Sequence, residues 1–427
     1  MISVTMLLVS IGLFLIRVPV SISLGIATLV GFWMIGIPPA VIPSRMIDGV
    51  DSFALLAVPF FILAGNLMNA GGVTERIFAF ARALVGWISG GLAQVNILAS
   101  VIFAGMSGSA LADLAGLGAV EIRAMRANGY PIGFSAAVTL SSCTIGPLIP
   151  PSIILVIYGL ATNTSIGQLF LGGLIAGLVV ALFLMIYVFI HVRSTKAEWA
   201  KPEPFVFADV LRTGVYGLPA LLAPVIILGA LVLGISTPSE LGAIATVYAL
   251  LVGLLYRQFT WRKIRYALVS TVSMTGVIMY LFAIASAMNF VIARERVAHH
   301  AAEYMAQMTT NPILGILIVN VFLIIVGMFL EGPVAILIIA PILLHVVSEF
   351  GMGPVQFGVM LSFNLLIGMI TPPMGIGLFV GGKVAGISPE AVFRATLPFF
   401  IPLLAGLAVI SYVPWVTEWL PSLVFHR

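Results

Sequence analysis

Two similar interruptions of apolar sequence, 222 residues apart, constrain the fold of this chain more than any other feature. Gly105-Met106 opens a Ser/Gly-rich break, and Pro150-Pro151 follows 45 residues later. Gly327-Met328 opens a second polar break, and Pro372-Pro373 again follows 45 residues later. Helix interruptions at matching places in two halves are typical of the binding site of a secondary transporter. The pattern therefore predicts an inverted repeat that is built around these breaks.

The composition indicates that the chain folds in a membrane. Apolar residues make up 61% of its 427 residues, charged residues make up 8%, and the mean hydropathy is +1.20. A soluble domain carries about 25% charged residues. Residues 127–192 and 267–293 contain no Asp, Glu, Lys or Arg, and each run exceeds the roughly 20 residues that cross a bilayer. We therefore expect an all-α polytopic membrane protein.

The N-terminal apolar stretch does not have the form of a removable signal peptide. Its first basic residue, Arg17, follows the apolar residues, whereas a signal peptide carries its charge ahead of them. Residues 1–17 are therefore expected to form a first retained span. Cys143 is the single cysteine, so an intrachain disulfide is excluded and the redox compartment cannot be inferred.

The basic residues predict the topology. They cluster in two loops, 193–201 and 257–265. Two predicted spans separate these loops, 214–236 and 238–256. The positive-inside rule makes both loops cytoplasmic, and counting spans puts Arg123 and Arg126 inside and residues 294–311 outside. The two breaks are then entered from opposite sides, as an inverted repeat requires.

An amphipathic segment precedes each break. Residues 74–90 and 295–308 carry apolar side chains at helical spacing beside charged ones, which predicts helices that lie along the membrane surface. Each half then contains a span, a surface helix, a re-entrant hairpin and a span broken at Pro-Pro. Loop-side helices without a mechanical role are the alternative, but the matched positions favour paired arms that support moving hairpins.

The hairpin tips are expected to carry the chemistry. In residues 105–110 one half-helix ends and another begins, and Ser109 or Ser107 is suited to cap the second half. At the second tip, Gly332 permits a turn and Pro333 fits the first helical position. Helix ends left bare in lipid cost several kcal/mol each. Carbonyls and hydroxyls there suit Na⁺, and a helix N-terminus suits a carboxylate. Close helix packing is the alternative for each Gly/Ser cluster.

The two Pro-Pro segments should break their spans opposite these tips, because proline removes a donor and clashes with the preceding turn. Thr371 adds a hydroxyl that its counterpart, Ile149, lacks. A kink without a ligand is the alternative reading of either segment. The carbonyls that could complete two cation sites are those of Thr144, Ile145, Gly146, Gly368, Met369 and Ile370.

Two acids lie in the breaks. Asp113 follows an uncharged run, residues 83–112, and Glu331 lies in the second tip. Ionisable groups at membrane depth are costly and usually functional. Asp113 could bind a cation or gate the substrate, or it could only complement a helix dipole. Glu331 could instead be a solvated turn residue.

These observations give a candidate set of site residues in three groups. The predicted substrate-binding residues are Ser107, Ser109, Pro150, Thr371 and Pro372. The predicted Na⁺ ligands, for at least two ions, are Gly105, Ser107, Gly108, Thr144, Gly146, Gly327, Glu331, Gly332, Gly368 and Met369. The predicted structural or gating residues are Asp113, Pro151 and Pro373.

Four runs of sequence resemble the large membrane subunit of TRAP (tripartite ATP-independent periplasmic) transporters, over essentially the whole chain. They are residues 58–68, 105–113 with Gly116 and Gly118, 146–152 and 370–375. The resemblance implies an elevator transporter, with a fixed scaffold and a mobile domain that contains both hairpins. It also implies Na⁺-coupled uptake of an organic acid anion, of the C4-dicarboxylate or sialic acid type, across the bacterial cytoplasmic membrane. The implied partners are a small four-helix membrane subunit, not fused here, and a periplasmic substrate-binding protein. Nucleic acid is not an expected partner.

The predicted organisation follows the repeat. It comprises scaffold helices (1–60), transport repeat 1 (61–192), cytoplasmic loops and scaffold helices (193–265), transport repeat 2 (266–396) and a C-terminal helix (397–427).

We do not expect an enzyme, although two alternatives to a carrier remain. Gly105-x-Ser107-Gly108 matches an intramembrane serine protease, whose serine needs a histidine base, and only His345 is placed by the sequence to reach the interior. A passive anion channel is the other alternative. A primary pump is disfavoured because no phosphate-loop motif is present.

Overall fold

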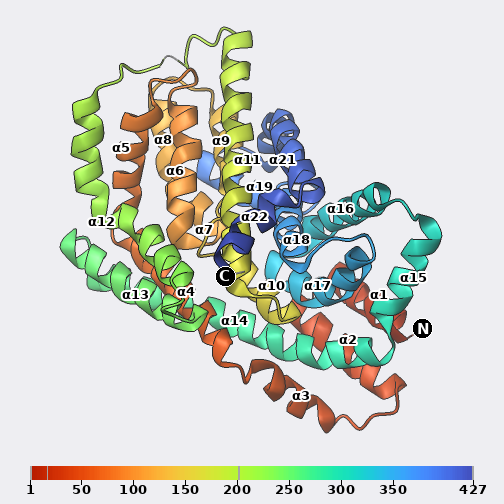
Figure 1. Cartoon of the computed structure of the whole chain (residues 1–427). Coiled ribbons are helices and arrows are strands. Elements are labelled where there is room, and N and C mark those ends of the chain that lie inside the picture. Colours follow the sequence, from red (N-terminus) through yellow and green to blue (C-terminus); the bar gives the residue numbers. More distant parts are fainter. Residues whose placement is uncertain (1, 17, 201, 426–427) are drawn as a thin grey trace.

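The protein is folded into helices and their connections throughout the part that the computed structural model describes, residues 2–16, 18–200 and 202–425 (Figure 1). The helices of the N-terminal half are α1 (Ile2–Leu15), α2 (Val20–Met34), α3 (Val41–Val50), the 3₁₀ helix η1 (Phe53–Leu56), α4 (Ala57–Ala70), α5 (Val73–Val85), α6 (Leu92–Ser107), α7 (Ala110–Ala115), α8 (Leu117–Ala127), α9 (Ile132–Cys143), α10 (Ile153–Thr162) and α11 (Ile166–Ser194). Those of the C-terminal half are α12 (Phe207–Val232), α13 (Pro238–Leu255), α14 (Trp261–Arg294), α15 (Val297–Met308), α16 (Pro312–Phe329), α17 (Gly332–Ser348), α18 (Pro354–Met369), α19 (Ile376–Ala385), α20 (Pro389–Thr396), the 3₁₀ helix η2 (Leu397–Phe399), α21 (Phe400–Tyr412) and α22 (Trp415–Phe425).

Helix length and composition confirm a polytopic membrane protein. Among the described residues, seven helical segments are long and apolar enough to cross a bilayer. They are Phe53–Ala70, Ile166–Ser194, Phe207–Val232, Pro238–Leu255, Trp261–Arg294, Pro312–Phe329 and Pro389–Tyr412. The predicted spans 214–236 and 238–256 correspond to α12 and α13, although α12 begins seven residues earlier, at Phe207.

The first helix is shorter than the predicted span. α1 has 14 residues, which at 1.5 Å per residue gives about 21 Å, less than the roughly 30 Å of a hydrocarbon core. It packs against α2, which has 15 residues. We therefore describe α1 and α2 as a pair of short apolar helices.

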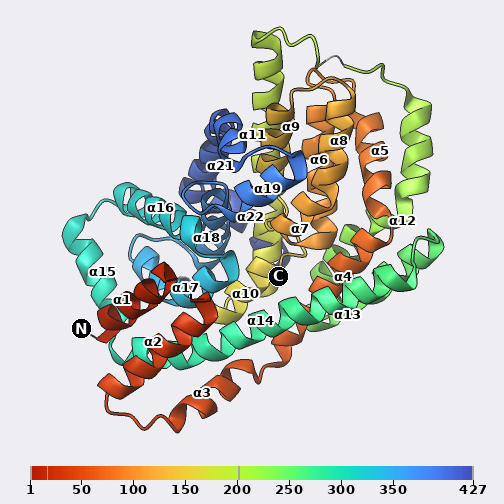
Figure 2. The ribbon, with the colours of Figure 1, turned by 180° about the vertical axis from the view of Figure 1, so that it is seen from behind.

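The long helix α14 organises one side of the molecule. Its 34 residues run past α4 at one end and past α2 and α3 at the other, which both views of the ribbon show (Figures 1 and 2). α4 packs closely on α13, where the hydroxyl of Thr246 donates to the carbonyl of Phe60 at 2.9 Å. In this group α4 and α14 are joined by the amide of Asn66, which donates to the hydroxyl of Thr271 at 2.9 Å.

A helix is present in each of the two segments that were predicted to lie along the membrane surface. α5 lies against α6, α8 and α12, and α15 lies against α14 and α17. The predicted helix 74–90 ends at Val85, and Gly90 (φ +105°) and Gly91 (φ +43°) then turn the chain into α6. The predicted helix 295–308 begins two residues late, at Val297. Each helix thus contacts the hairpin that follows it.

The two hairpins exchange contacts between the halves. The first hairpin consists of α6, α7 and α8, and the second consists of α16 and α17. The first limb of each lies against the broken helix of its own half, α6 on α9 and α16 on α18. The second limb lies against both broken helices, α7 and α8 on α9 and α19, and α17 on α18 and α10. This reciprocal arrangement is what a twofold-related inverted repeat produces.

A buried amide bridge joins the first limb of each hairpin to its broken helix. Asn96 accepts from the hydroxyl of Ser142 at 2.8 Å, and the amide of Asn364 donates to Asn320 at 2.8 Å. All four side chains are buried. Buried hydrogen bonds of this kind fix the register of the helices that carry them.

Candidate functional site

The first hairpin tip has the predicted broken-helix geometry. α6 ends at Ser107, Gly108 has a left-handed backbone (φ +62°), and α7 begins at Ala110. Ser109 caps α7, since its hydroxyl accepts from the backbone N–H of Ala112 at 3.4 Å. Glycine suits the turn because it adopts positive φ without steric cost. Of the two predicted caps, the structure selects Ser109.

The first tip lies directly on the first Pro-Pro break. A methyl group at Gly108 would overlap the carbonyl oxygen of Pro151, and one at Gly65 would lie 3.1 Å from the carbonyl oxygen of Ser107. The tip is thus held between the break and α4. The predicted meeting of the first tip and the first break is confirmed.

The second tip is more extended. α16 ends at Phe329, Leu330 and Glu331 have extended backbones, and α17 begins at Gly332. Pro333 is therefore the second residue of α17, one position later than predicted. This tip also meets its break, because a methyl group at Gly327 would lie 2.8 Å from the carbonyl oxygen of Leu365.

The two Pro-Pro segments have the same local structure. Pro150-Pro151 and Pro372-Pro373 are both joined by cis peptide bonds. At the first break, turn hydrogen bonds use the carbonyls of Ser141, Ser142, Cys143 and Ile145, so within the described chain those of Thr144 and Gly146 receive no backbone donor. At the second, the carbonyl of Gly368 accepts from the N–H of Thr371 at 2.9 Å, while those of Met369 and Ile370 receive none in the described residues.

A cavity of about 130 Å³ lies between the two tips and the two breaks. Four helices begin at residues that line it: α7 at Ala110, α10 at Ile153, α17 at Gly332 and α19 at Ile376. Two more end at lining residues, α16 at Phe329 and α18 at Met369, and Gly108 follows the end of α6. Helix N-termini carry partial positive charge and helix C-termini partial negative charge. The cavity is therefore bordered by helix ends of both polarities.

The predicted residues divide between the cavity wall and its support. Those that line the cavity are Gly108, Ser109, Gly327, Glu331, Gly332 and Met369. Those that lie outside the lining are Gly105, Ser107, Asp113, Thr144, Gly146, Pro150, Pro151, Gly368, Thr371, Pro372 and Pro373. Thr371 follows the end of α18, and its hydroxyl donates at 2.7 Å to the carbonyl of Ile367 in the last turn of that helix.

Several lining residues were not predicted. Met274 and Ile278 of α14 close one wall, and Ile154 and Leu366 contribute beside the breaks. No local pattern singled them out, because one apolar residue in a membrane helix looks like another. Only the packing of α14 against α17 of the second hairpin places its residues here.

Asp113 is buried beneath the first tip. It is 1% exposed, and the hydroxyl of Ser107 donates to its Oδ1. Its Oδ2 has no hydrogen-bond partner among the described residues and points at Gly146, where a methyl group would overlap it. Asp113 therefore links the tip to the Gly146 region of the break.

Among the described residues, no histidine is hydrogen-bonded to Ser107, as a serine protease would require. The expectation that His345 reaches the interior is wrong: its side chain is exposed, and its ring lies 6.3 Å from that of His299 on α15. His345 of α17 therefore lies beside α15 rather than at the hairpin tips. Ser107 instead donates to Asp113, which leaves it without a base of the protease type.

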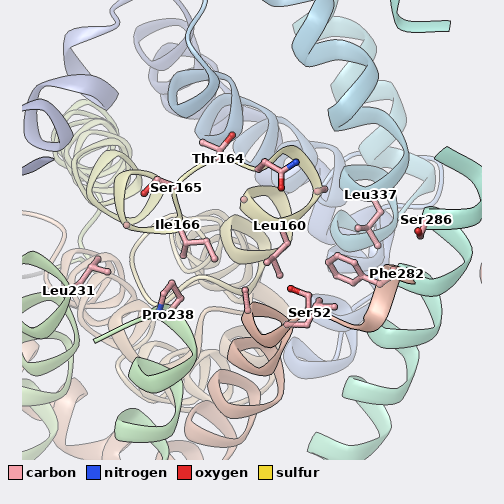
Figure 3. A pocket seen from close by; sticks show the side chains of 18 of the residues that line it. Ser52, Leu160, Thr164, Ser165, Ile166, Leu231, Pro238, Phe282, Ser286 and Leu337 are labelled. Carbon is pink, nitrogen blue, oxygen red and sulfur yellow. The ribbon is translucent and has the colours of Figure 1, made fainter. Parts of the chain in front are cut away.

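A second, larger cavity of about 820 Å³ lies apart from the breaks (Figure 3). It opens between the α10–α11 and α12–α13 turns and the helices α14 and α17. Hydroxyls of Ser52, Thr164, Ser165 and Ser286 line it, and none of its described lining residues is charged. It contains none of the predicted site residues, so we assign the site to the smaller cavity between the tips.

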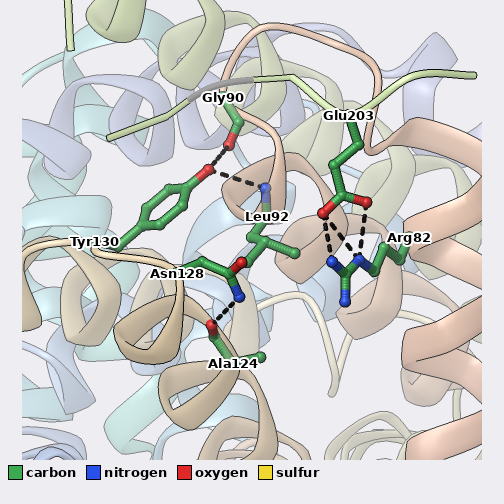
Figure 4. A network of polar contacts seen from close by, with 7 residues as sticks. All are labelled: Arg82, Gly90, Leu92, Ala124, Asn128, Tyr130 and Glu203. Carbon is green, nitrogen blue, oxygen red and sulfur yellow. Dashed lines mark hydrogen bonds and ion pairs between the residues drawn. The ribbon is translucent and has the colours of Figure 1, made fainter. Parts of the chain in front are cut away.

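The segment between α11 and α12 is fastened over the base of the first hairpin (Figure 4). Arg82 of α5 binds Glu203 through two nitrogens, with contacts from 2.5 to 3.0 Å. The hydroxyl of Tyr130 accepts from the N–H of Leu92 at 3.1 Å and donates to the carbonyl of Gly90 at 2.9 Å. Burial raises the pKa of Tyr130 to about 12, so the hydroxyl keeps the proton that it donates.

Comparisons with known proteins give a consistent family. The family model described as "Tripartite ATP-independent periplasmic transporter, DctM component" matches residues 7–416. The chain is 42% identical over 385 residues to the sialic acid TRAP transporter large permease protein SiaM of Vibrio cholerae, covering 89% of each. It is 35% identical over 438 residues to the C4-dicarboxylate TRAP transporter large permease protein DctM of the same organism, covering 97% of this chain and 96% of that one. Among solved structures, the YdaH transporter of Alcanivorax borkumensis aligns with a TM-score of 0.64 at 16% identity over 87% of each chain, a likeness of fold alone.

Proposed function

Because this chain belongs to the DctM family, the large permease subunits of tripartite ATP-independent periplasmic transporters, we propose that it takes up an organic acid anion together with Na⁺. The family makes it a secondary transporter rather than an enzyme, and a multi-pass protein of the bacterial inner membrane. Relatives named for sialic acid and for C4-dicarboxylates support a substrate of one of these two types.

The observation that carries the proposal is the mixed polarity of the tip cavity. Helix N-termini at Ile153 and Gly332 face it and suit a carboxylate. Among its described lining residues Glu331 is the one ionisable side chain, and neither Lys nor Arg is present. An anion bound there receives no charge neutralisation from a basic residue. Bound cations supply it, which couples anion binding to Na⁺.

We assign one Na⁺ to each repeat. In the first, the hydroxyl of Thr144 is already bonded to the carbonyl of Ser141 at 2.7 Å, so the carbonyls of Thr144 and Gly146 are the main donors, with Asp113 nearby. In the second, the carbonyls of Met369 and Ile370 take that role. Hard cations prefer such oxygen ligands. With two Na⁺ and a monoanion, one net positive charge moves inward and gains roughly 2.3 kcal/mol per 100 mV.

We propose an elevator in which the hairpins and broken helices move as a unit. The contacts favour a scaffold of α1–α4 and α12–α14, which is wider than the division based on sequence, because α4 and α14 pack mainly on α13, α2 and α3. The moving unit touches it where α4 meets α6 and α10, where α12 meets α6, and where α14 meets α17. The small four-helix membrane subunit and the periplasmic binding protein are the proposed partners.

Reconstitution tests this function. The chain is placed in liposomes with its small membrane subunit, a candidate binding protein is added outside, and uptake of sialic acid and of succinate is followed with and without an inward Na⁺ gradient. We expect uptake of one acid that requires both Na⁺ and the binding protein, with a Hill slope for Na⁺ near two. Passive flux that is independent of both would indicate a channel, and a slope near one would contradict two Na⁺ sites.

A further inference from the structure

A second buried acid of the first hairpin has no role in the site described so far. Glu121 of α8 is 0% exposed, and neither of its carboxylate oxygens has a hydrogen-bond partner among the described residues. Burying an unpaired carboxylate costs several kcal/mol, so a cation must neutralise it. The residues around Glu121 show whether a basic side chain of the protein could be that cation.

The face of α8 that carries Glu121 packs on a polar seam between α6 and α9. Gly118 and Met125, one turn to either side, lie on the same face of the helix. A methyl group at Gly118 would lie 2.8 Å from the side chain of Thr139, and the sulfur of Met125 lies 3.8 Å from the amide of Asn96. Asn96 in turn donates to Thr139 at 2.6 Å. Between Gly118 and Met125, Glu121 therefore lies on the part of α8 that faces Asn96 and Thr139, whose side chains are both buried.

No basic side chain of the surrounding elements pairs with Glu121 in the described structure. The helices packed on α8 are α5, α6, α7, α9 and α19, and α6 and α9 contain no charged residue. The basic residues of the others are engaged elsewhere or exposed: Arg82 binds Glu203, Arg76 lies 3.7 Å from the ring centre of Tyr256, and Lys383 is exposed.

The acids and the remaining charges around α8 do not change this conclusion. Glu75 of α5 is exposed, as are Arg123 and Arg126 of α8 itself. Asp113 of α7 is near enough for its charge to repel that of Glu121. Neutralisation must therefore come from outside the protein.

We propose that Glu121, beside Asn96 and Thr139, is a third cation-binding site of the carrier, which takes up one monovalent cation, Na⁺ or a proton, on the outer side and releases it inside in every cycle. The inference rests on the proposed function, because it assumes that the first hairpin belongs to the moving unit. The cation binds to the carboxylate without any other bond forming or breaking, and it returns to solution as the same ion. The site is separate from the tip cavity, which Glu121 does not line.

The test measures how many charges move with each substrate. Glu121→Gln keeps the shape of the side chain and mimics its neutral, loaded state. Reconstituted native protein and the variant accumulate substrate to equilibrium at 0 and at −100 mV, set by potassium and valinomycin. The quantity compared is the ratio of accumulation at −100 mV to accumulation at 0 mV. If the variant moves one charge fewer per substrate, this ratio is about 50-fold smaller in the variant than in the native protein. Glu303→Gln, on the exposed arm helix α15, is the matched control and should accumulate like the native protein.

Two further arms identify the cation. If the cation is Na⁺, a tenfold inward Na⁺ gradient raises accumulation by the native protein ten times more than accumulation by the variant. A gradient of one pH unit, inside alkaline, does the same if it is a proton. Glu121→Asp keeps the carboxylate and should retain the third charge even if Glu121→Gln folds poorly.

The outcomes separate this inference from the proposed function. Equal voltage and gradient dependence of native protein and Glu121→Gln would overturn the third site and make Glu121 a permanently neutral acid. A monodisperse Glu121→Gln variant that neither accumulates nor exchanges substrate would also overturn it, because a mimic of the loaded state should still move. A native protein without Na⁺-dependent uptake would instead contradict the proposed function itself.

Discussion

At the scale of single residues, Gly108 is fixed as glycine both by its backbone conformation and by its contact with the Pro-Pro break. It has a φ of +62°, and a methyl group on it would overlap the carbonyl oxygen of Pro151. The left-handed conformation alone costs an alanine about 1 kcal/mol, and the overlap forces the tip off its break. We expect Gly108→Ala to reduce Na⁺-driven uptake at least tenfold, measured as initial rate in liposomes.

Gly36 provides the matched control for this substitution. Its φ is +71°, and no atom lies within 4 Å of where a methyl group would stand. Gly36→Ala should therefore lower the melting temperature through backbone strain alone, and its uptake rate should stay near that of the native protein. Equal losses of uptake in both variants would show that strain, rather than contact with Pro151, explains the effect.

Residue chemistry also sets the limit of what the sequence predicts about the site. The cap at Ser109 was predictable because a serine before a helix has one dominant use. Thr371 was predicted to bind the substrate, and this stays a prediction. Its hydroxyl donates to the carbonyl of Ile367, four residues earlier, a bond that threonine commonly makes with the backbone. Glu121 was not identified at all, because a single acid close to Arg123 and Arg126 is indistinguishable in sequence from a solvated one until its burial is known.

At the scale of elements, the segment between α11 and α12 depends on one ion pair. Arg82 and Glu203 have side chains that are 44% and 35% exposed, and exposed pairs contribute roughly 0–1 kcal/mol. We therefore expect Arg82→Ala to change the melting temperature little but to release the segment locally. Limited proteolysis should cut near residues 195–206 several-fold faster in the variant, and the swapped pair Arg82→Glu with Glu203→Arg should restore protection. Unchanged cleavage would show that the aromatic contact of Trp87 with Phe205 suffices.

The elements themselves followed from periodicity more fully than their packing did. The helices α5 and α15, the hairpins and the breaks lie where apolar runs, Gly/Ser clusters and Pro-Pro pairs predicted them, because each depends on local backbone chemistry. The exchange of hairpin limbs between the halves, α17 on α10 and α7 on α19, depends on contacts between residues hundreds of positions apart. A single sequence carries no local signal for such contacts, which also explains why the α14 wall of the cavity was not predicted.

At the scale of the whole molecule, the elevator requires two bodies whose interface slides. α14 and α17 meet across that interface, where the amide of Asn289 donates to the carbonyl of Leu337 at 3.4 Å. Within the proposed scaffold, by contrast, Asn66 and Thr271 join α4 to α14. A covalent link at the first place should stop the movement, whereas a link at the second should not affect it.

Paired cysteines test this prediction directly, since Cys143 is the one native cysteine and can be replaced by serine first. In that background Asn289→Cys with Leu337→Cys, cross-linked by a short bifunctional reagent cleavable by reductant, should lose more than 90% of uptake and regain it on reduction. Asn66→Cys with Thr271→Cys, treated identically, should keep its uptake rate. Full uptake by the cross-linked Asn289/Leu337 pair would mean that α14 and α17 move together, and the scaffold would then have to be drawn without α14.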